Sequence, residues 1–119
     1  MINRNELRIG NYITDIYSSK NAYFEIVNIG EDTTKYGAGF CSYYSHIKPI
    51  PLTEKWLLDF GFENKEENWE KSDSNLWDFL IILDYESFMY SYSKLEIKHV
   101  HQLQNLYFAL TGEELTLNP

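Results

Sequence analysis

Cysteine is almost absent from this chain of 119 residues, which contains Cys41 alone. One thiol cannot form an internal disulfide, and the first ten residues, MINRNELRIG, have no apolar run after a basic start. Small secreted domains commonly depend on disulfides, and their precursors begin with a signal peptide that has an apolar run after a basic start. We therefore expect a protein of a reducing cytoplasm.

Long apolar runs are also missing. The longest, LWDFLIILDY at 76–85, is interrupted by Asp78. It is far shorter than the roughly 20 residues that span a bilayer. We therefore expect no membrane partner.

The local motifs of common enzyme classes do not occur either. The sequence has no G-x-S-x-G, no C-x-x-C, no H-E-x-x-H and no phosphate-binding glycine loop. Carboxylates are numerous, but a glycosidase also needs a cleft and one shielded carboxyl group, which spacing alone does not provide. We predict neither an enzyme nor a bound cofactor.

Positive charge is scarce, and the shortage is local. The net charge is −8; residues 1–53 carry five basic and five acidic side chains, whereas residues 54–86 carry three lysines and ten carboxylates. Because lysine and arginine drive nucleic-acid binding, this acidic stretch disfavours a nucleic-acid partner. Two interpretations remain: a solvated face that keeps the protein soluble, or a surface for a basic protein partner. The candidate contact residues are Glu63, Glu66, Glu67, Glu70 and Asp73.

Apolar and aromatic residues, by contrast, are abundant, at 44% and 17% of the chain. That is enough for a packed core, and the length fits one compact domain. Strand-forming stretches at 11–17, 23–29 and 40–50 are separated by turn-forming segments, of which 30–39 is a polar connection. Residues 1–50 therefore predict a small β subdomain with a three-stranded, SH3-like curled sheet.

Residues 51–119 predict a second subdomain, made of a helix, strands and a helix. Thr53 is a good N-cap, apolar residues recur after it at helical spacing, and Gly61 suits the helix end. The apolar run 76–85 predicts a central strand among about three further antiparallel strands. The whole domain, 1–119, is therefore expected to be α+β.

The segment KHVHQLQNLYFALTG, residues 98–112, predicts the second helix. Its apolar stripe would join the first helix and the central strand in one core. We expect that core to contain Trp56, Leu57, Phe60, Leu80, Ile82, Val100, Leu103, Tyr107 and Leu110. An adjoining polar-aromatic face either packs between solvent and sheet or contacts a partner. Its residues are His101, Gln104, Asn105 and Phe108.

The histidines of this segment raise the question of a metal site. At 100° per residue, His99 and His101 lie about 200° apart around the predicted helix. Two zinc ligands on a helix need i,i+3 or i,i+4 spacing to converge. We predict no metal site.

A nucleic-acid-binding module is the alternative function. The order helix, three strands, helix matches double-stranded RNA-binding domains, but those domains bind through basic residues, and Lys98 is the only fixed cation at the start of the second helix. Tyrosines on strands would stack on bases, together with one face of the second helix. The residues concerned are Tyr43, Tyr44, Tyr90, Tyr92, His101 and Phe108.

Three blocks carry a resemblance to a known family. LRIGNYI, PIPLTEKWLLDFGF and VHQLQNLYFALTGEEL resemble the hallmark blocks of a family of small uncharacterised proteins encoded in Bacteroidales bacteria and their phages. No activity is known for that family, so the resemblance assigns no catalytic or binding residues. It implies the cytoplasm of a bacterial host cell and an accessory role, including interference with host defences.

Charge, length and this resemblance together predict a small non-catalytic interaction protein. We expect it to be associated with a phage or mobile element and to bind an unidentified protein partner, with the acidic stretch as one contact surface.

Overall fold

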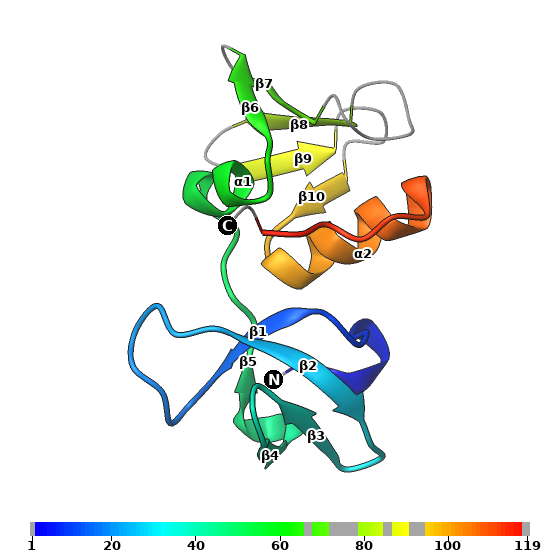
Figure 1. The fold of residues 1–119 in the computed structure, drawn as a ribbon. Helices are drawn as coiled ribbons and strands as arrows, with labels where there is room; N and C mark the ends of the chain where they lie inside the picture. The colour runs from blue at the N-terminus through cyan, green and yellow to red at the C-terminus, as the bar shows by residue number, and fades with distance from the viewer. Residues whose placement is uncertain (1, 66–67, 72–78, 85–86, 91–94, 118–119) are drawn as a thin grey trace. The chain divides into compact units, whose positions relative to one another are not determined.

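The computed structural model of the protein describes residues 2–65, 68–71, 79–84, 87–90 and 95–117 (Figure 1). The fold is α+β, as the sequence predicts. The chain divides into two compact units, Met1–Ile50 and Pro51–Pro119, which are named unit 1 and unit 2.

Unit 1 contains five antiparallel strands in the order β4-β3-β2-β1-β5. Strands β1 to β4 pair with their neighbours in sequence, and β5 pairs with the other side of β1. Two 3-10 turns accompany them. The bounds are η1 (Arg4–Glu6), β1 (Tyr12–Asp15), β2 (Phe24–Ile29), β3 (Thr33–Tyr36), β4 (Phe40–Tyr43), η2 (Tyr44–His46) and β5 (Ile47–Lys48).

The prediction of three strands in this unit is wrong in two places. The segment 30–39, predicted as a polar connection, contains β3, whose polar Thr34 is buried and donates its hydroxyl proton to the carbonyl oxygen of Asn28 at 2.7 Å. The stretch 40–50, predicted as one strand, is divided into β4 and β5 by η2. Hydrophobic patterning misses this strand because one of its two buried residues is a hydrogen-bonded threonine and the other is Tyr36. The SH3-like curl of the sheet stays a prediction.

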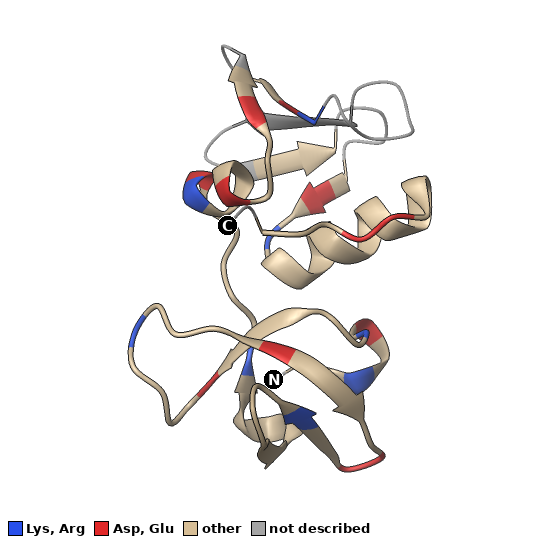
Figure 2. Cartoon of the chain, in the orientation of Figure 1, with Lys and Arg blue, Asp and Glu red and all other residues tan. Residues whose placement is uncertain are grey.

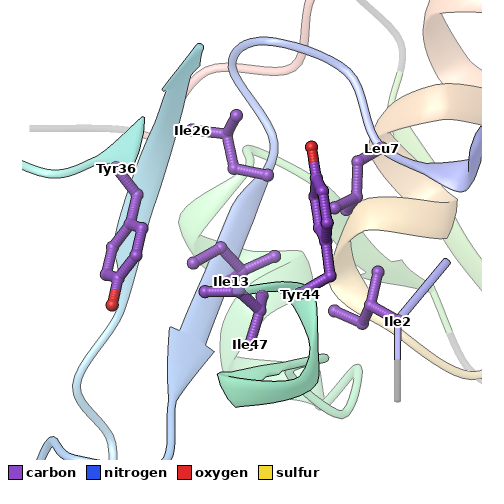
Figure 3. Close-up of a cluster of buried hydrophobic side chains, with 7 residues drawn as sticks. All are labelled: Ile2, Leu7, Ile13, Ile26, Tyr36, Tyr44 and Ile47. Atoms are coloured by element: carbon purple, nitrogen blue, oxygen red, sulfur yellow. The ribbon is translucent and has the colours of Figure 1, made fainter. Parts of the chain in front are cut away.

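A cluster of aliphatic and tyrosine side chains forms the core of unit 1 (Figure 3). Its members are Ile2, Leu7, Ile13, Ile26, Tyr36, Tyr44 and Ile47. Figure 3 shows the two tyrosines on opposite sides of Ile13, Ile26 and Ile47, with their hydroxyls pointing in opposite directions. The Tyr44 hydroxyl donates to the carbonyl oxygen of Gly30 at 2.6 Å. Each ring thus fills the core while its hydroxyl reaches a polar partner at the edge.

Unit 2 contains five antiparallel strands in the order β10-β9-β8-β7-β6, with α1 near β6 and α2 near β10 (Figure 1). The predicted central strand is β8, the middle strand of the sheet. The sequence predicts about three strands here, whereas the structure has five. The helix–three strands–helix order of double-stranded RNA-binding domains therefore does not apply. The bounds are α1 (Glu54–Asp59), β6 (Glu63–Lys65), β7 (Asn68–Lys71), β8 (Phe79–Asp84), β9 (Ser87–Tyr90), β10 (Leu95–Ile97) and α2 (Val100–Thr111).

The helix ends follow local chemistry. Thr53 caps α1 by accepting a hydrogen bond from the Trp56 amide, and Gly61, with φ of 91°, ends the helix region in a left-handed conformation. At the start of α2 the Gln102 side chain accepts hydrogen bonds from the amides of Lys98 and His99, at 2.9 and 3.0 Å. These bonds satisfy backbone donors that a helix start leaves without partners in the helix.

The core of unit 2 includes five residues predicted for it: Leu57, Phe60, Val100, Leu103 and Tyr107 are buried. Trp56 is half-buried, and the side chains of Leu80 and Ile82 lie outside the described residues. The prediction for Leu110 is wrong, since it is 39% exposed.

The reason for the error at Leu110 is that α2 turns a different face inward. Its buried residues include three polar ones, His101, Gln104 and Thr111. At 100° per residue the centre of the buried face lies about 70° away from the apolar stripe seen in the sequence. Hydrophobicity alone therefore assigns the face incorrectly.

The two leucines of α2 test this orientation. We expect Leu103→Ala, at a fully buried position, to lower the free energy of unfolding of unit 2 by about 2–5 kcal/mol. Leu110→Ala, the control on the same helix, should cost less than about 1 kcal/mol. All three tryptophans belong to unit 2, so fluorescence during urea denaturation reports on this unit. Equal losses in the two variants would contradict the orientation.

Candidate functional site

An open cavity of about 770 Å³ in unit 1 is lined mainly by aromatic and small polar side chains. It is named the aromatic groove. The segments that form it are the end of β1 with the turn after it, β3, β4 and η2. Its lining residues are Asp15, Tyr17, Ser18, Thr33, Tyr36, Phe40, Cys41, Ser42, Tyr43 and His46.

Asp15 occupies the last position of β1 and is 6% exposed. Its Oδ1 atom accepts hydrogen bonds from the amides of Tyr17, at 3.1 Å, and Ser18, at 2.8 Å. An aspartate that accepts bonds from the backbone two and three residues ahead fixes a turn at the end of a strand. This turn places the side chain of Tyr17 at the groove.

The second carboxylate oxygen of Asp15 holds Tyr36. The Tyr36 hydroxyl donates to Oδ2 at 2.6 Å and is also within hydrogen-bond distance, 2.9 Å, of the Ser42 hydroxyl. One hydroxyl group thereby connects residues of β1, β3 and β4. The Tyr36 ring stacks on Phe40, with ring centres 5.7 Å apart, which sets the position of Phe40 at the groove.

The electrostatics of this pair follow from its hydrogen bonds. Burial by itself raises the pKa of Asp15, but the hydrogen bonds from Tyr36, Ser18 and the Tyr17 amide together lower the pKa below its ordinary value. Burial and the bond to Asp15 raise the pKa of Tyr36. At neutral pH the groove therefore contains an ionised carboxylate that accepts a hydrogen bond from a protonated phenol.

Three aromatic side chains of the groove are exposed to solvent. Tyr17 is 66% exposed, Phe40 53% and Tyr43 60%. His46 lies between the two tyrosines: its Nδ1 atom is 2.7 Å from the Tyr17 hydroxyl, and its ring meets both tyrosine rings edge to face. Exposed rings in fixed positions at an open cavity provide contact area for a partner at a low cost in conformational entropy.

The polar groups of the groove do not form a nucleophile and base pair within the described part of the chain. The Ser42 hydroxyl is bonded to the Tyr36 hydroxyl, and His46 Nδ1 is bonded to the Tyr17 hydroxyl. A Ser–His mechanism needs a hydrogen bond between those two residues. The carboxylate of Asp15 is occupied by the turn and by Tyr36. The arrangement is suited to binding.

The acidic residues predicted as contacts lie elsewhere. Glu63 on β6 and Glu70 on β7 are directly paired across the two strands, so their side chains are on the same face of the sheet. Glu63 is exposed and Glu70 half-buried. Glu66, Glu67 and Asp73 lie outside the described residues.

The predicted exposed face of α2 is not formed. His101 and Gln104 are buried, Asn105 is half-buried and Phe108 is partly exposed. Because the helix presents this side to the interior of unit 2, His101 and Gln104 are core residues. Of the two interpretations of this face, contact with a partner is therefore wrong for His101 and Gln104. Of the tyrosines proposed for stacking, Tyr43 is exposed and Tyr44 is buried.

The geometry predicted for the two histidines is also wrong. Their rings are nearly parallel, with centres 5.7 Å apart and an interplanar angle of 12°. The reason is that His99 is the N-cap, with an extended backbone, so the spacing of 100° per residue begins only at Val100. Imidazole lone pairs lie in the ring plane, so stacked rings do not aim them at one ion. Among the described residues, no group of three metal-ligating side chains is found.

The helices in the described part of the chain, α1 and α2, both lack the length and apolar character of a membrane-spanning helix.

Of the groove residues, Tyr43 is a candidate contact in the sequence analysis, whereas Asp15, Tyr17 and His46 are not. The one available signal was local: an aspartate at a strand end, followed by serines, is typical of a turn.

Comparison of the chain with family models, curated proteins and solved structures finds no match. The chemistry of the aromatic groove is therefore the basis for assigning a function.

Removing the Tyr36 hydroxyl tests how far the groove depends on it. We expect Tyr36→Phe to lower the stability of unit 1 by about 1–3 kcal/mol, because the buried carboxylate loses a hydrogen bond. Amide hydrogen exchange in β1 and β3 measures the stability of this unit separately from unit 2. Unchanged exchange rates would contradict the expectation.

The difference in stability between the wild type and Tyr36→Phe should also depend on pH. Because the pKa of Asp15 is lower in the folded state, its ionised form stabilises unit 1 above about pH 4, and this contribution is lost as the pH falls through the folded-state pKa. Tyr36→Phe removes one bond that lowers the pKa, so its stability should fall less steeply in acid. Tyr44→Phe, which removes a hydroxyl bonded to a backbone carbonyl, is the control and should keep the wild-type acid dependence.

Proposed function

We propose that the protein is a non-catalytic interaction protein that binds another protein through the aromatic groove of unit 1. The observation that carries the proposal is the gathering of Tyr17, Phe40 and Tyr43, all more than half exposed, around one open cavity. Large exposed aromatic side chains that cluster on a monomer are typical of interaction sites, and tyrosine is enriched among residues that dominate binding energy.

The position of β4 supports a protein as the partner. This strand is at the end of the strand order and pairs with β3 alone among the described strands. Its remaining backbone N–H and C=O groups can pair with an extended segment of another chain, while alternate side chains of that segment enter neighbouring pockets. Phe40 and Tyr43, which line the groove, are the first and last residues of this strand.

The charge of the groove opposes the alternative, a nucleic acid. Among the described residues that line it, Asp15 is the only carboxylate, and no lysine or arginine is present. Stacking of bases on Tyr17 or Tyr43 would bring phosphates near this carboxylate without a cation to neutralise them. The burial of Tyr44 and His101 also removes two of the residues on which that alternative depended.

The acidic stretch supports a second contact with a basic partner. Glu63 and Glu70 place two acidic side chains opposite each other on neighbouring strands. Figure 2 shows further acidic residues on α1 and β10 of the same unit. A basic protein surface, including one that otherwise binds nucleic acid, would complement the acidic side chains of Glu63 and Glu70.

The cellular setting is part of the proposal. Cys41 is exposed and forms no disulfide, which suits a reducing cytoplasm. The resemblance to Bacteroidales and phage proteins points to a bacterial host cell and to a protein associated with a phage or mobile element. An accessory protein directed at a host factor fits this setting.

Affinity capture with groove variants tests the proposal. Wild-type protein, Tyr17→Ala and Tyr43→Ala would be used to capture partners from a nuclease-treated Bacteroidales lysate. We expect a specific protein that the wild type retains and both variants lose by about tenfold or more, because truncating a central aromatic contact commonly costs 1–2 kcal/mol or more. The control is Tyr23→Ala, which removes an exposed tyrosine of unit 1 outside the groove.

The outcomes separate the candidate functions. Equal retention of the partner by all variants would contradict the groove as the contact surface. Loss of every partner on nuclease treatment, with direct salt-dependent binding of the purified protein to RNA or DNA, would favour the nucleic-acid alternative.

A further inference from the structure

We infer that the carboxylate of Asp15 binds the ammonium group of a lysine side chain that the protein partner inserts into the aromatic groove. The inference rests on the proposed function, because it concerns the same groove, and it adds the chemistry of the bound group. The carboxylate and the three exposed rings are parts of one cavity lining.

The charge of the groove would attract a cation, because Asp15 is in its lining and no lysine or arginine is. Asp15 is buried, and within the described part of the chain it forms no ion pair; its partners are Tyr36 and the turn residues Tyr17 and Ser18. Burying an ionised carboxylate costs free energy that hydrogen bonds offset and that an opposite charge offsets further. The open side of the cavity is the route by which such a charge arrives.

The hydrogen bonds of Asp15 favour lysine over arginine. Oδ1 already accepts from two backbone amides, and Oδ2 accepts from the Tyr36 hydroxyl. A guanidinium group binds a carboxylate best through two parallel bonds, one to each oxygen, and that geometry is blocked here. An ammonium group acts as a point charge and needs one accessible acceptor.

The aromatic rings of the groove would contact the rest of the lysine side chain. A cation within about 6 Å of an aromatic face is attracted by the negative face of the ring, and tyrosine and phenylalanine both provide it. The methylene stem of lysine packs on apolar surface while its charged end reaches a polar group. Tyr17, Phe40 and Tyr43 surround the opening with such surface, and Asp15 provides the polar group.

Small probes test the inference without a known partner. Nα-acetyl-lysine methylamide, the norleucine analogue that lacks the ammonium group, and the arginine analogue would be titrated into the full-length protein and followed by NMR. We expect the lysine probe to shift the signals of Tyr17, Tyr43 and Asp15 with a Kd on the order of 1–10 mM. The norleucine and arginine probes should each bind at least about tenfold more weakly.

Asp15→Asn tests the role of the charge. Asparagine keeps the size and the acceptor oxygen that holds the turn, so we expect a folded variant that has lost lysine binding by about tenfold or more. Glu25→Gln is the matched control, since it removes one negative charge from an exposed position of β2 outside the groove and should bind as the wild type does. If Asp15→Asn does not fold, the comparison of the lysine and norleucine probes on the wild type decides the question.

Two results would overturn the inference. One is equal binding of the lysine and norleucine probes to the wild type; the other is wild-type affinity for lysine in folded Asp15→Asn. Either result leaves the proposed function standing if Tyr17→Ala and Tyr43→Ala still lose the captured protein. Failure of that capture comparison, with lysine binding intact, would instead count against the proposed function alone.

Discussion

The hydrogen bonds to the Asp15 carboxylate are the interaction on which the geometry of unit 1 depends most. Through Oδ1 they fix the turn after β1, and through Oδ2 they hold the Tyr36 hydroxyl, which also meets Ser42 on β4. Each of these bonds positions a residue of the groove: the turn positions Tyr17, and the Tyr36 ring positions Phe40 by stacking. The fold of unit 1 and the geometry of the aromatic groove therefore both depend on the buried carboxylate of Asp15.

The same carboxylate connects stability with binding. Its hydrogen bonds outweigh the cost of burial and keep the carboxylate ionised, so a ligand that supplies a cation meets a full negative charge in the groove. Unit 2 differs, because its buried polar residues, including Thr111 and Gln104, belong to the packed face of α2. The Thr111 hydroxyl, for example, donates to the carbonyl oxygen of Tyr107 within that helix. In unit 1 the buried carboxylate of Asp15 instead lines an open cavity.

Features that depend on local chemistry were predictable from the sequence. Thr53, Gly61 and the residues around Gly112 mark helix ends because capping needs only neighbours along the chain. The middle position of β8 followed from its apolar run. The link between Asp15 and Tyr36, 21 residues apart, has no local pattern, and neither has the burial of His101. For this reason the two helices and the central strand of unit 2 were predicted, whereas its number of strands, the buried face of α2 and the aromatic groove were not.

The central role of Asp15 is tested most directly by a pH titration of its side chain, followed through the NMR signal of the carboxyl carbon. The hydrogen bonds in the structure require a midpoint below the ordinary aspartate value of about 3.9. The signal should then show an ionised carboxylate throughout the physiological range. A midpoint at or above that value would mean that burial outweighs the hydrogen bonds, and it would contradict the central role of Asp15.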